Sequence, residues 1–172
     1  MELVENHPLD PGRIASLIAD KDDLFLVWPI AKWPFDPDQW REALDPAKGH
    51  VSFIVCDHGR AIGHAALRKS DSPGTYKVSF LYLLPEFRTK GLGHCMVTAL
   101  EHYALHRLGA KRLRLVVRDY NPRAIKCYLQ CGFRETGREG TRIDMQKELP
   151  EQSTEDQPTS ACDAATRAAH ED

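Results

Sequence analysis

Two glycines and two cationic residues that follow a long apolar run form the segment best suited to chemistry. The apolar run Tyr76–Leu84 leads into Arg88, Lys90, Gly91 and Gly93. Glycine lets the backbone approach a ligand without a Cβ in the way, and the first N–H groups of a helix lack internal partners and carry partial positive charge. With two cations at the same rim, this segment predicts a cradle for a pyrophosphate.

Neither of two well-known phosphate-binding patterns describes this segment. No Gly-Lys-Ser/Thr sequence follows, as the Walker pattern requires. The dinucleotide fingerprint fails too, because its third glycine is missing and the preceding strand is not the first of a βαβ unit. A nucleotide-binding module therefore stays an alternative without a supporting motif.

The cradle needs a strand before it and a helix after it. Tyr76–Leu84 is nearly continuous in β-forming apolar residues, which is typical of a central strand buried on both faces. The predicted helix runs from Gly91 to about Leu108, and Gly109 is placed to end it. Its apolar residues recur at helical spacing, at Leu92, Cys95, Met96, Ala99, Leu100 and Tyr103.

The remaining elements alternate between strands and helices. Arg112–Arg118 alternates polar and apolar residues, with Leu113, Leu115 and Val117 on one side of a predicted strand. This order predicts one α/β domain built on a single mixed sheet. The other predicted elements are helices at Pro11–Ala19 and Asp38–Leu44, strands at Val51–Cys56 and Ala61–Leu67 joined by a hairpin turn, a helix opened by Asn121 and Pro122 and closed by Gly132, and strands at Phe133–Gly137 and Ile143–Leu149.

Composition sets the domain limits and argues against several classes of protein. The 172 residues suit one domain, predicted at 1–149. Residues 150–172 hold six acids against one base and almost no large apolar residue, so we predict a disordered acidic tail. The net charge of −2 and the lack of a long apolar run give no sign of a nucleic-acid partner or a membrane, and we expect a cytoplasmic protein.

The cysteine and histidine spacings predict no metal site. Five cysteines are an odd number without the spacing of a disulfide framework. Cys127 and Cys131 would share one helix face, but no further ligand supports a metal there. His102 and His106 lie four residues apart on the polar side of their helix, which indicates a solvated face.

Two motifs in order resemble the GNAT acetyltransferase family. Arg88–Gly93 is similar to the family's Arg/Gln-x-x-Gly-x-Gly/Ala motif, and Val117–Phe133 is similar to its second signature. The resemblance spans about Val51 to Leu149. It implies a mixed, mostly antiparallel sheet in which two parallel strands splay apart, flanked by helices. It also implies an N-acetyltransferase that moves acetyl from acetyl-CoA to a primary amine by direct attack and releases coenzyme A.

The resemblance further implies roles for individual residues. Pantetheine would lie between the splayed strands, and the pyrophosphate would lie on the amides of Thr89–His94. Tyr128 would be the general acid that protonates the departing sulfur, a role that suits a phenol; the alternative is a core aromatic residue. The implied cofactor-binding residues are Leu81, Tyr82, Leu83, Arg88, Thr89, Lys90, Gly91, Leu92, Gly93, His94 and Asn121.

The general base and the acceptor are left open. Some family members that acetylate protein N-termini carry a glutamate at the position of Val116. With valine there, the amine would lose its proton through water or via Ser79, Tyr82 or Glu86. The missing glutamate favours a small-molecule amine over a protein or peptide N-terminus or lysine. A catalytically silent acyl-CoA sensor is a further alternative, against which Tyr128 argues.

The segment Asp22–Trp40 contains all three tryptophans of the chain. Aromatic walls near acidic residues would suit a cationic amine, so Trp28, Trp33 and Phe35 are the predicted acceptor residues. The alternative is a proline-ordered loop whose aromatic residues cap the core. The oligomeric state is left open, with a homodimer among the alternatives.

Overall fold

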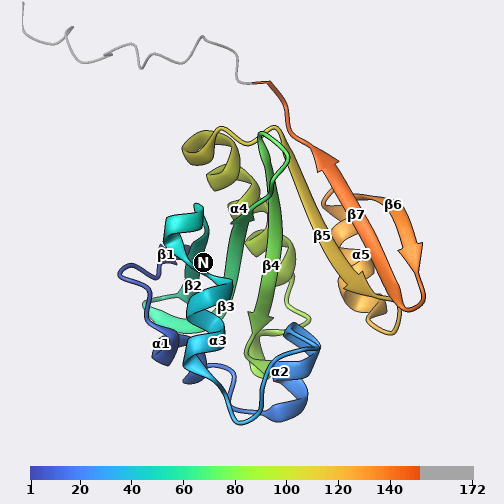
Figure 1. The fold of residues 1–172 in the computed structure, drawn as a ribbon. Coiled ribbons are helices and arrows are strands. Elements are labelled where there is room, and N and C mark those ends of the chain that lie inside the picture. Colours follow the sequence, from blue (N-terminus) through green and yellow to red (C-terminus); the bar gives the residue numbers. More distant parts are fainter. Residues whose placement is uncertain (152–172) are drawn as a thin grey trace, which may run out of the picture.

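The computed structural model describes residues 1–151, which form seven strands and five α-helices (Figure 1). The predicted tail lies outside the described residues, except for its first two. No helix within residues 1–151 is both long enough and apolar enough to cross a bilayer. The strands are β1 (Glu2–Glu5), β2 (Val51–Asp57), β3 (Arg60–Lys69), β4 (Thr75–Leu83), β5 (Arg112–Arg118), β6 (Arg134–Glu139) and β7 (Arg142–Glu148). The helices are α1 (Pro11–Ala15), α2 (Lys21–Val27), α3 (Pro37–Ala43), α4 (Leu92–Leu108) and α5 (Pro122–Gln130), with 3₁₀ turns η1 (Pro46–Lys48) and η2 (Pro85–Phe87).

All seven strands belong to one sheet, in the order β1-β2-β3-β4-β5-β7-β6. Only β4 and β5 run parallel, and every other neighbouring pair is antiparallel. The two parallel neighbours are separated in the chain by α4, as a parallel crossover requires. The predicted fold class, a mixed and mostly antiparallel α/β sheet flanked by helices, is confirmed.

β4 and β5 pair at one end only. Thr75–Lys77 lies beside Arg112–Arg114; beyond these residues β4 pairs only with β3, and β5 pairs only with β7. In Figure 1 the two strands are side by side at the upper end and diverge toward the lower end, with α4 behind them. The expected splay between the two parallel strands is therefore present, and we call the space between them the β4–β5 gap.

A hydrophobic core lies on each face of the sheet. On one face α4 and α5 pack against β5, where Leu113, Leu115 and Val117 are buried as the alternating sequence predicts. On the other face α1, α2 and α3 enclose a second core around the fully buried Trp40. Figure 1 shows these three helices over the β2–β4 half of the sheet. Side chains of β5 on this second face, such as the exposed Arg114, therefore lack a helical cover.

A bulge in β4 exchanges the two faces of that strand. The β3–β4 register shifts between His64 and Ala66, and Phe80 has a φ of 54°. Before the bulge Val78 belongs to the core under α4, whereas Phe80 belongs to the core under α1–α3. A left-handed φ is unfavourable for phenylalanine, so neighbouring contacts must hold it. The buried His64 does so by donating from Nδ1 to the Phe80 carbonyl oxygen over 3.0 Å.

Two elements escape the sequence patterns. β1 is a four-residue edge strand whose side chains are mostly exposed, so no alternation marks it. α2 lies in the segment interpreted as an aromatic loop, and the Asp20 side chain caps it through the amides of Asp22 and Asp23. The predicted helix Pro11–Ala19 also ends early, at Ala15. The other predicted elements agree with the structure to within two residues at each end. The largest differences are at β3 and β6, each of which ends two residues later than predicted.

Candidate active site

The wide end of the β4–β5 gap is bounded by the start of α4. Gly91 is the N-cap, with a φ of 75° and no side-chain cap, and the first helical hydrogen bond runs from the Cys95 amide to the Gly91 carbonyl over 3.2 Å. The amides of Leu92, Gly93 and His94 precede that bond and have no intrahelical partner. A Cβ at Gly91 would meet no atom within 4 Å, so the space beside Gly91 itself is open. This arrangement fits an anionic pyrophosphate.

The two cations of the loop have different surroundings. Arg88 donates from Nε to the Leu83 carbonyl over 2.8 Å and pairs with Asp23 over 2.8 Å. Its guanidinium also lies over the Tyr82 ring, 5.3 Å from the ring centroid. Arg88 therefore fastens the loop to α2 instead of reaching outward. Lys90 forms no ion pair within residues 1–151 and lies 5.5 Å from the Phe87 ring centroid, so it is the cation available at the rim.

The backbone of β4 forms one wall of the gap. Leu81, Tyr82 and Leu83 have no strand partner on the β5 side within residues 1–151, although the Leu83 carbonyl accepts from Arg88. Backbone N–H and C=O groups that lack a protein partner need water or a ligand. Because of the bulge, Leu81 and Leu83 contact the core under α4, and the Tyr82 side chain turns to the other face. An extended chain of amides between β4 and β5 could therefore bond to this strand edge.

Asn121 is the N-cap of α5, and Tyr128 lies on this helix. The Asn121 side chain caps α5 by accepting from the Ala124 amide over 3.3 Å. Tyr128 is half-buried against Phe133, with ring centroids 6.1 Å apart, and its hydroxyl has no hydrogen bond within residues 1–151. Burial raises the pKa of Tyr128 above its ordinary value, and the neighbouring Cys127 and Cys131 add to the shift. A raised pKa keeps the phenol protonated, as a proton donor requires.

The three candidate bases all have partners. The Tyr82 hydroxyl donates to Asp23 over 3.0 Å, and burial followed by this bond raises the pKa of Tyr82 to about 12. A phenol with such a pKa stays protonated at neutral pH and cannot act as a base. Glu86 pairs with Arg60 over 2.9 Å, and the Ser79 hydroxyl donates to the Lys77 carbonyl over 3.4 Å. The structure therefore excludes Tyr82 as a base near neutral pH, while Glu86 and Ser79 each have one polar partner.

The aromatic segment packs mainly on the core. Trp28 meets Trp40 edge-on at 5.1 Å between ring centroids, and Phe35 stacks on Trp40 at 5.4 Å. Both are partly buried at the second core, whereas the Trp33 side chain is 43% exposed. These contacts agree with aromatic residues that cap the core. Of the three predicted acceptor residues, Trp33 is the most exposed.

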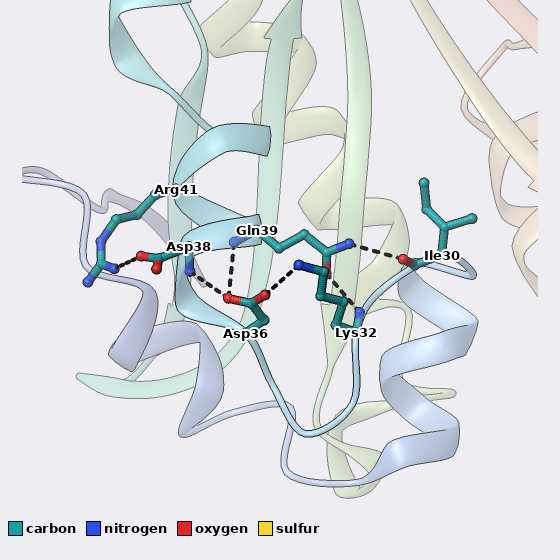
Figure 2. Close-up of polar contacts among 6 residues, drawn as sticks. All are labelled: Ile30, Lys32, Asp36, Asp38, Gln39 and Arg41. Carbon is teal, nitrogen blue, oxygen red and sulfur yellow. Dashed lines mark hydrogen bonds and ion pairs between the residues drawn. The ribbon is translucent and has the colours of Figure 1, made fainter.

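The connection between α2 and α3 is held by its own polar groups (Figure 2). Gln39 accepts from the Lys32 amide over 2.8 Å and donates to the Ile30 carbonyl over 3.0 Å. Lys32 pairs with Asp36, whose side chain caps α3. The hydrogen bond with Lys32, followed by the bonds from the α3 backbone amides, lowers the pKa of Asp36. The loop that carries Trp33 is thus fastened at both ends to α3.

An open pocket of about 740 Å³ lies at the narrow end of the gap. Lys77 and Arg114, the last residues of the β4–β5 pairing, line it together with Val116, which occupies the position of the glutamate found in some relatives. The sequence interpretation did not single out this pocket. The only sign of the pocket in the sequence is that cationic residues recur on several strands, and this pattern is also typical of an ordinary solvated face. Six cationic side chains line it, namely Lys48, Arg68, Lys69, Lys77, Arg114 and Arg142.

No cluster of histidine, cysteine or acidic side chains within residues 1–151 could hold a metal ion. His102 and His106 are exposed on α4, with ring centroids 4.3 Å apart. Cys127 and Cys131 contact each other on α5 as expected from their spacing, and burial raises the pKa of both thiols.

Comparison with known proteins identifies the family. The sequence profile of the Acetyltransferase (GNAT) family matches residues 18–133, which is more than half of the chain. The chain therefore belongs to the GNAT acetyltransferase family. As a member, it is an N-acetyltransferase that uses acetyl-CoA. The start of α4 and the β4–β5 gap supply an open site that fits this cofactor.

Several solved structures share the fold at low sequence identity. Spermidine N-acetyltransferase from Vibrio cholerae, in complex with CoA and spermine, has a TM-score of 0.70 and 19% identity over 85% of this chain and 94% of that one. Aminoglycoside acetyltransferase AAC(6')-Ib with coenzyme A has a TM-score of 0.70 and 19% identity over 86% and 94%. The GNAT domain of S. lividans PAT has a TM-score of 0.71 and 15% identity over 86% and 89%.

Proposed function

We propose that this protein transfers the acetyl group of acetyl-CoA to a primary amine of a small molecule, by direct attack in a ternary complex. One observation carries the proposal: the β4–β5 gap leads from the uncapped start of α4 to an open pocket at Lys77 and Arg114. The pyrophosphate would be held at the first end, and the acceptor would enter at the second.

The reaction makes three demands on the chain. Acetyl-CoA supplies an acyl group on a thiolate leaving group, so the site needs a neutral amine, a donor for the carbonyl oxygen and a proton for the sulfur. A free backbone amide of β4 near Leu83 suits the carbonyl oxygen, because charge develops there as the C–N bond forms. Tyr128 suits the sulfur, because its hydroxyl is protonated and uncommitted to protein partners within residues 1–151.

The amine would lose its proton to water before it attacks, without a protein base. Ser79, Tyr82 and Glu86 each have a partner, and the raised pKa of Tyr82 removes it as a base near neutral pH. A solvent route requires that the amine enters largely deprotonated. The rate should therefore rise with pH up to the pKa of the amine itself, without a lower inflection from a protein base.

Two alternatives concern the acceptor and the chemistry. A protein or peptide amine is the first alternative. Some family members that acetylate protein N-termini carry a glutamate where this chain has Val116, and the valine speaks against an enzyme of that kind. A silent acyl-CoA sensor is the second, and the uncommitted Tyr128 hydroxyl speaks against it. Among proteins of similar fold, those named for spermidine and for aminoglycosides act on small amines. A cytoplasmic location stays a prediction from composition.

A screen with acetyl-CoA tests the proposal directly. Purified protein is incubated with acetyl-CoA and a panel of small amines and short peptides, and the released thiol is measured. Turnover of small amines supports the proposal. Turnover of peptides alone would favour the first alternative. Tight binding of acetyl-CoA without thiol release from any amine or peptide would favour the sensor.

A further inference from the structure

The pocket at the narrow end of the gap has an unusual excess of positive charge. Its six cationic side chains face only two carboxylates, Asp71 and Asp144. Arg142 and Asp144 pair with each other over 2.8 Å, and Asp71 is exposed on a loop. The other five cations, namely Lys48, Arg68, Lys69, Lys77 and Arg114, form no ion pair within residues 1–151.

Two of these cations are partly withdrawn from solvent, which is unlike an ordinary solvated face. The Arg68 guanidinium lies over the Phe80 ring at 5.5 Å, and its buried Nε has no hydrogen-bond partner within residues 1–151. Burial lowers the pKa of Lys77, and repulsion by Arg68 and Arg142 adds to this effect while Asp144 opposes it. Arg68 and Lys77 thus carry positive charge that is partly buried and that no carboxylate neutralises through an ion pair.

The neutral members of the lining do not offset this charge. Burial lowers the pKa of His50, and repulsion by Arg68 and Lys48 contributes further. His50 Nδ1 accepts from the Lys69 amide over 3.1 Å, so the ring is a neutral acceptor there and does not supply an anion. The pocket therefore presents guanidinium and ammonium groups that can each donate to an oxyanion.

The pocket lies at the opposite end of the gap from the α4 amides. From Lys77 to Leu83 the strand rises by about 20 Å, at about 3.3 Å per residue. The pyrophosphate assigned to the start of α4 would therefore be remote from the cations around Lys77. The positive charge of the pocket therefore lies where the acceptor would bind, far from the phosphates of the cofactor.

We infer that the acceptor amine also carries an anionic group, a carboxylate or a phosphate, which the cations around Lys77 and Arg114 bind. This inference rests on the proposed function and narrows its substrate class. Binding of the anion would leave the neutral amine free to reach the narrow end of the gap. A polycationic acceptor would meet like charge, and the single free carboxylate, Asp71, could not offset it.

Matched pairs of amines test the inference. One pair is ethanolamine and O-phosphoethanolamine, the other is propylamine and β-alanine, and spermidine is the polycation. We expect kcat/KM to be about ten-fold higher or more for the anionic member of at least one pair, the effect of one charge-assisted hydrogen bond. Preference for the phosphate or for the carboxylate pair identifies which anion is bound. The preference should weaken as salt is added.

Charge-removal variants connect the preference to the pocket. Arg114→Gln and Lys77→Gln should each reduce the anionic-to-neutral ratio of kcat/KM by roughly ten-fold. Arg112→Gln is the control, because Arg112 lies on the same strand outside the pocket and pairs with Glu148. The ratio within a pair cancels the intrinsic reactivity of each amine. Arg114 is exposed, so its replacement tests the pocket even if the Lys77 variant does not fold.

The outcomes separate the inference from the proposed function. Preference for spermidine, or unchanged ratios in both pocket variants, would overturn the inference while leaving the N-acetyltransferase proposal in place. A loss of acetyl-CoA affinity in Arg114→Gln, measured by thermal shift, would assign the pocket to the cofactor and would also overturn it. If acetyl-CoA binds but no amine of any charge releases thiol, the proposed function fails and the inference fails with it.

Discussion

Replacement of Tyr128 by phenylalanine separates a proton donor from a core aromatic residue. The change removes only the hydroxyl, which has no hydrogen bond within residues 1–151, and retains the ring contact with Phe133. We therefore expect the free energy of unfolding to change by no more than about 0.5 kcal/mol. Turnover should fall by about 10²-fold or more, or roughly 2.7 kcal/mol in activation free energy, because one general acid is lost.

Tyr103→Phe is a matched control for this variant. Tyr103 lies on α4, and its hydroxyl donates to Glu5 over 2.6 Å, away from the gap. Its replacement should lower the free energy of unfolding by about 1 kcal/mol or less and leave turnover unchanged. The two variants thus predict opposite patterns: Tyr128→Phe affects the rate and hardly the stability, whereas Tyr103→Phe affects the stability and not the rate.

Steady-state thiol release with an amine found in the screen gives kcat and KM, and urea denaturation gives the free energy of unfolding. The loss in Tyr128→Phe should appear in kcat, because proton donation strengthens only as the thiolate forms. If the variant retains kcat within about two-fold of the parent, water protonates the sulfur and the role assigned to Tyr128 is wrong.

Three further predictions concern the loop, the bulge and the tail. Gly91→Val should greatly reduce the thermal shift produced by acetyl-CoA, whereas Gly59→Val, at a similar φ of 77° and with open space around it, carries the same backbone strain and should retain the shift. Burial lowers the pKa of His64 to about 4, so the unfolded chain takes up a proton below its ordinary pKa of about 6.5 and the folded chain does not. The free energy of unfolding should therefore fall by roughly 3 kcal/mol as pH falls from 6.5 to 4, and urea titrations of His64→Gln should lack this contribution; an equal slope in both proteins would contradict the assignment. A chain that ends at Pro150 should keep its melting temperature and acetyl-CoA affinity, and a large loss of either would mean that the tail binds the domain.

The fold and the cofactor loop could be predicted because their signals are local. Glycine at a helix start, an apolar run and helical spacing lie within a few residues of one another, and they located α4 and β4 to within one residue. The two motifs together implied the splay that the pairing of β4 with β5 confirms. By contrast, the bulge at Phe80 was not predicted, because β4 is apolar at every position from Phe80 to Leu83 and either face could therefore be the buried one there.

The sequence by itself determined most of the elements, their order and the family, since each depends on residue types at short spacings, whereas β1 and α2 escaped it. The tertiary structure alone decided which charges are free. Arg88 looks like a phosphate ligand in the sequence, but the folded chain brings Asp23 to it over 2.8 Å from 65 residues away. Arg68, Lys77 and Arg114 look like separate solvated cations, but the register of three strands sets them around one pocket. Electrostatic interactions depend on distance in space and on burial, and neither can be obtained from separation along the chain.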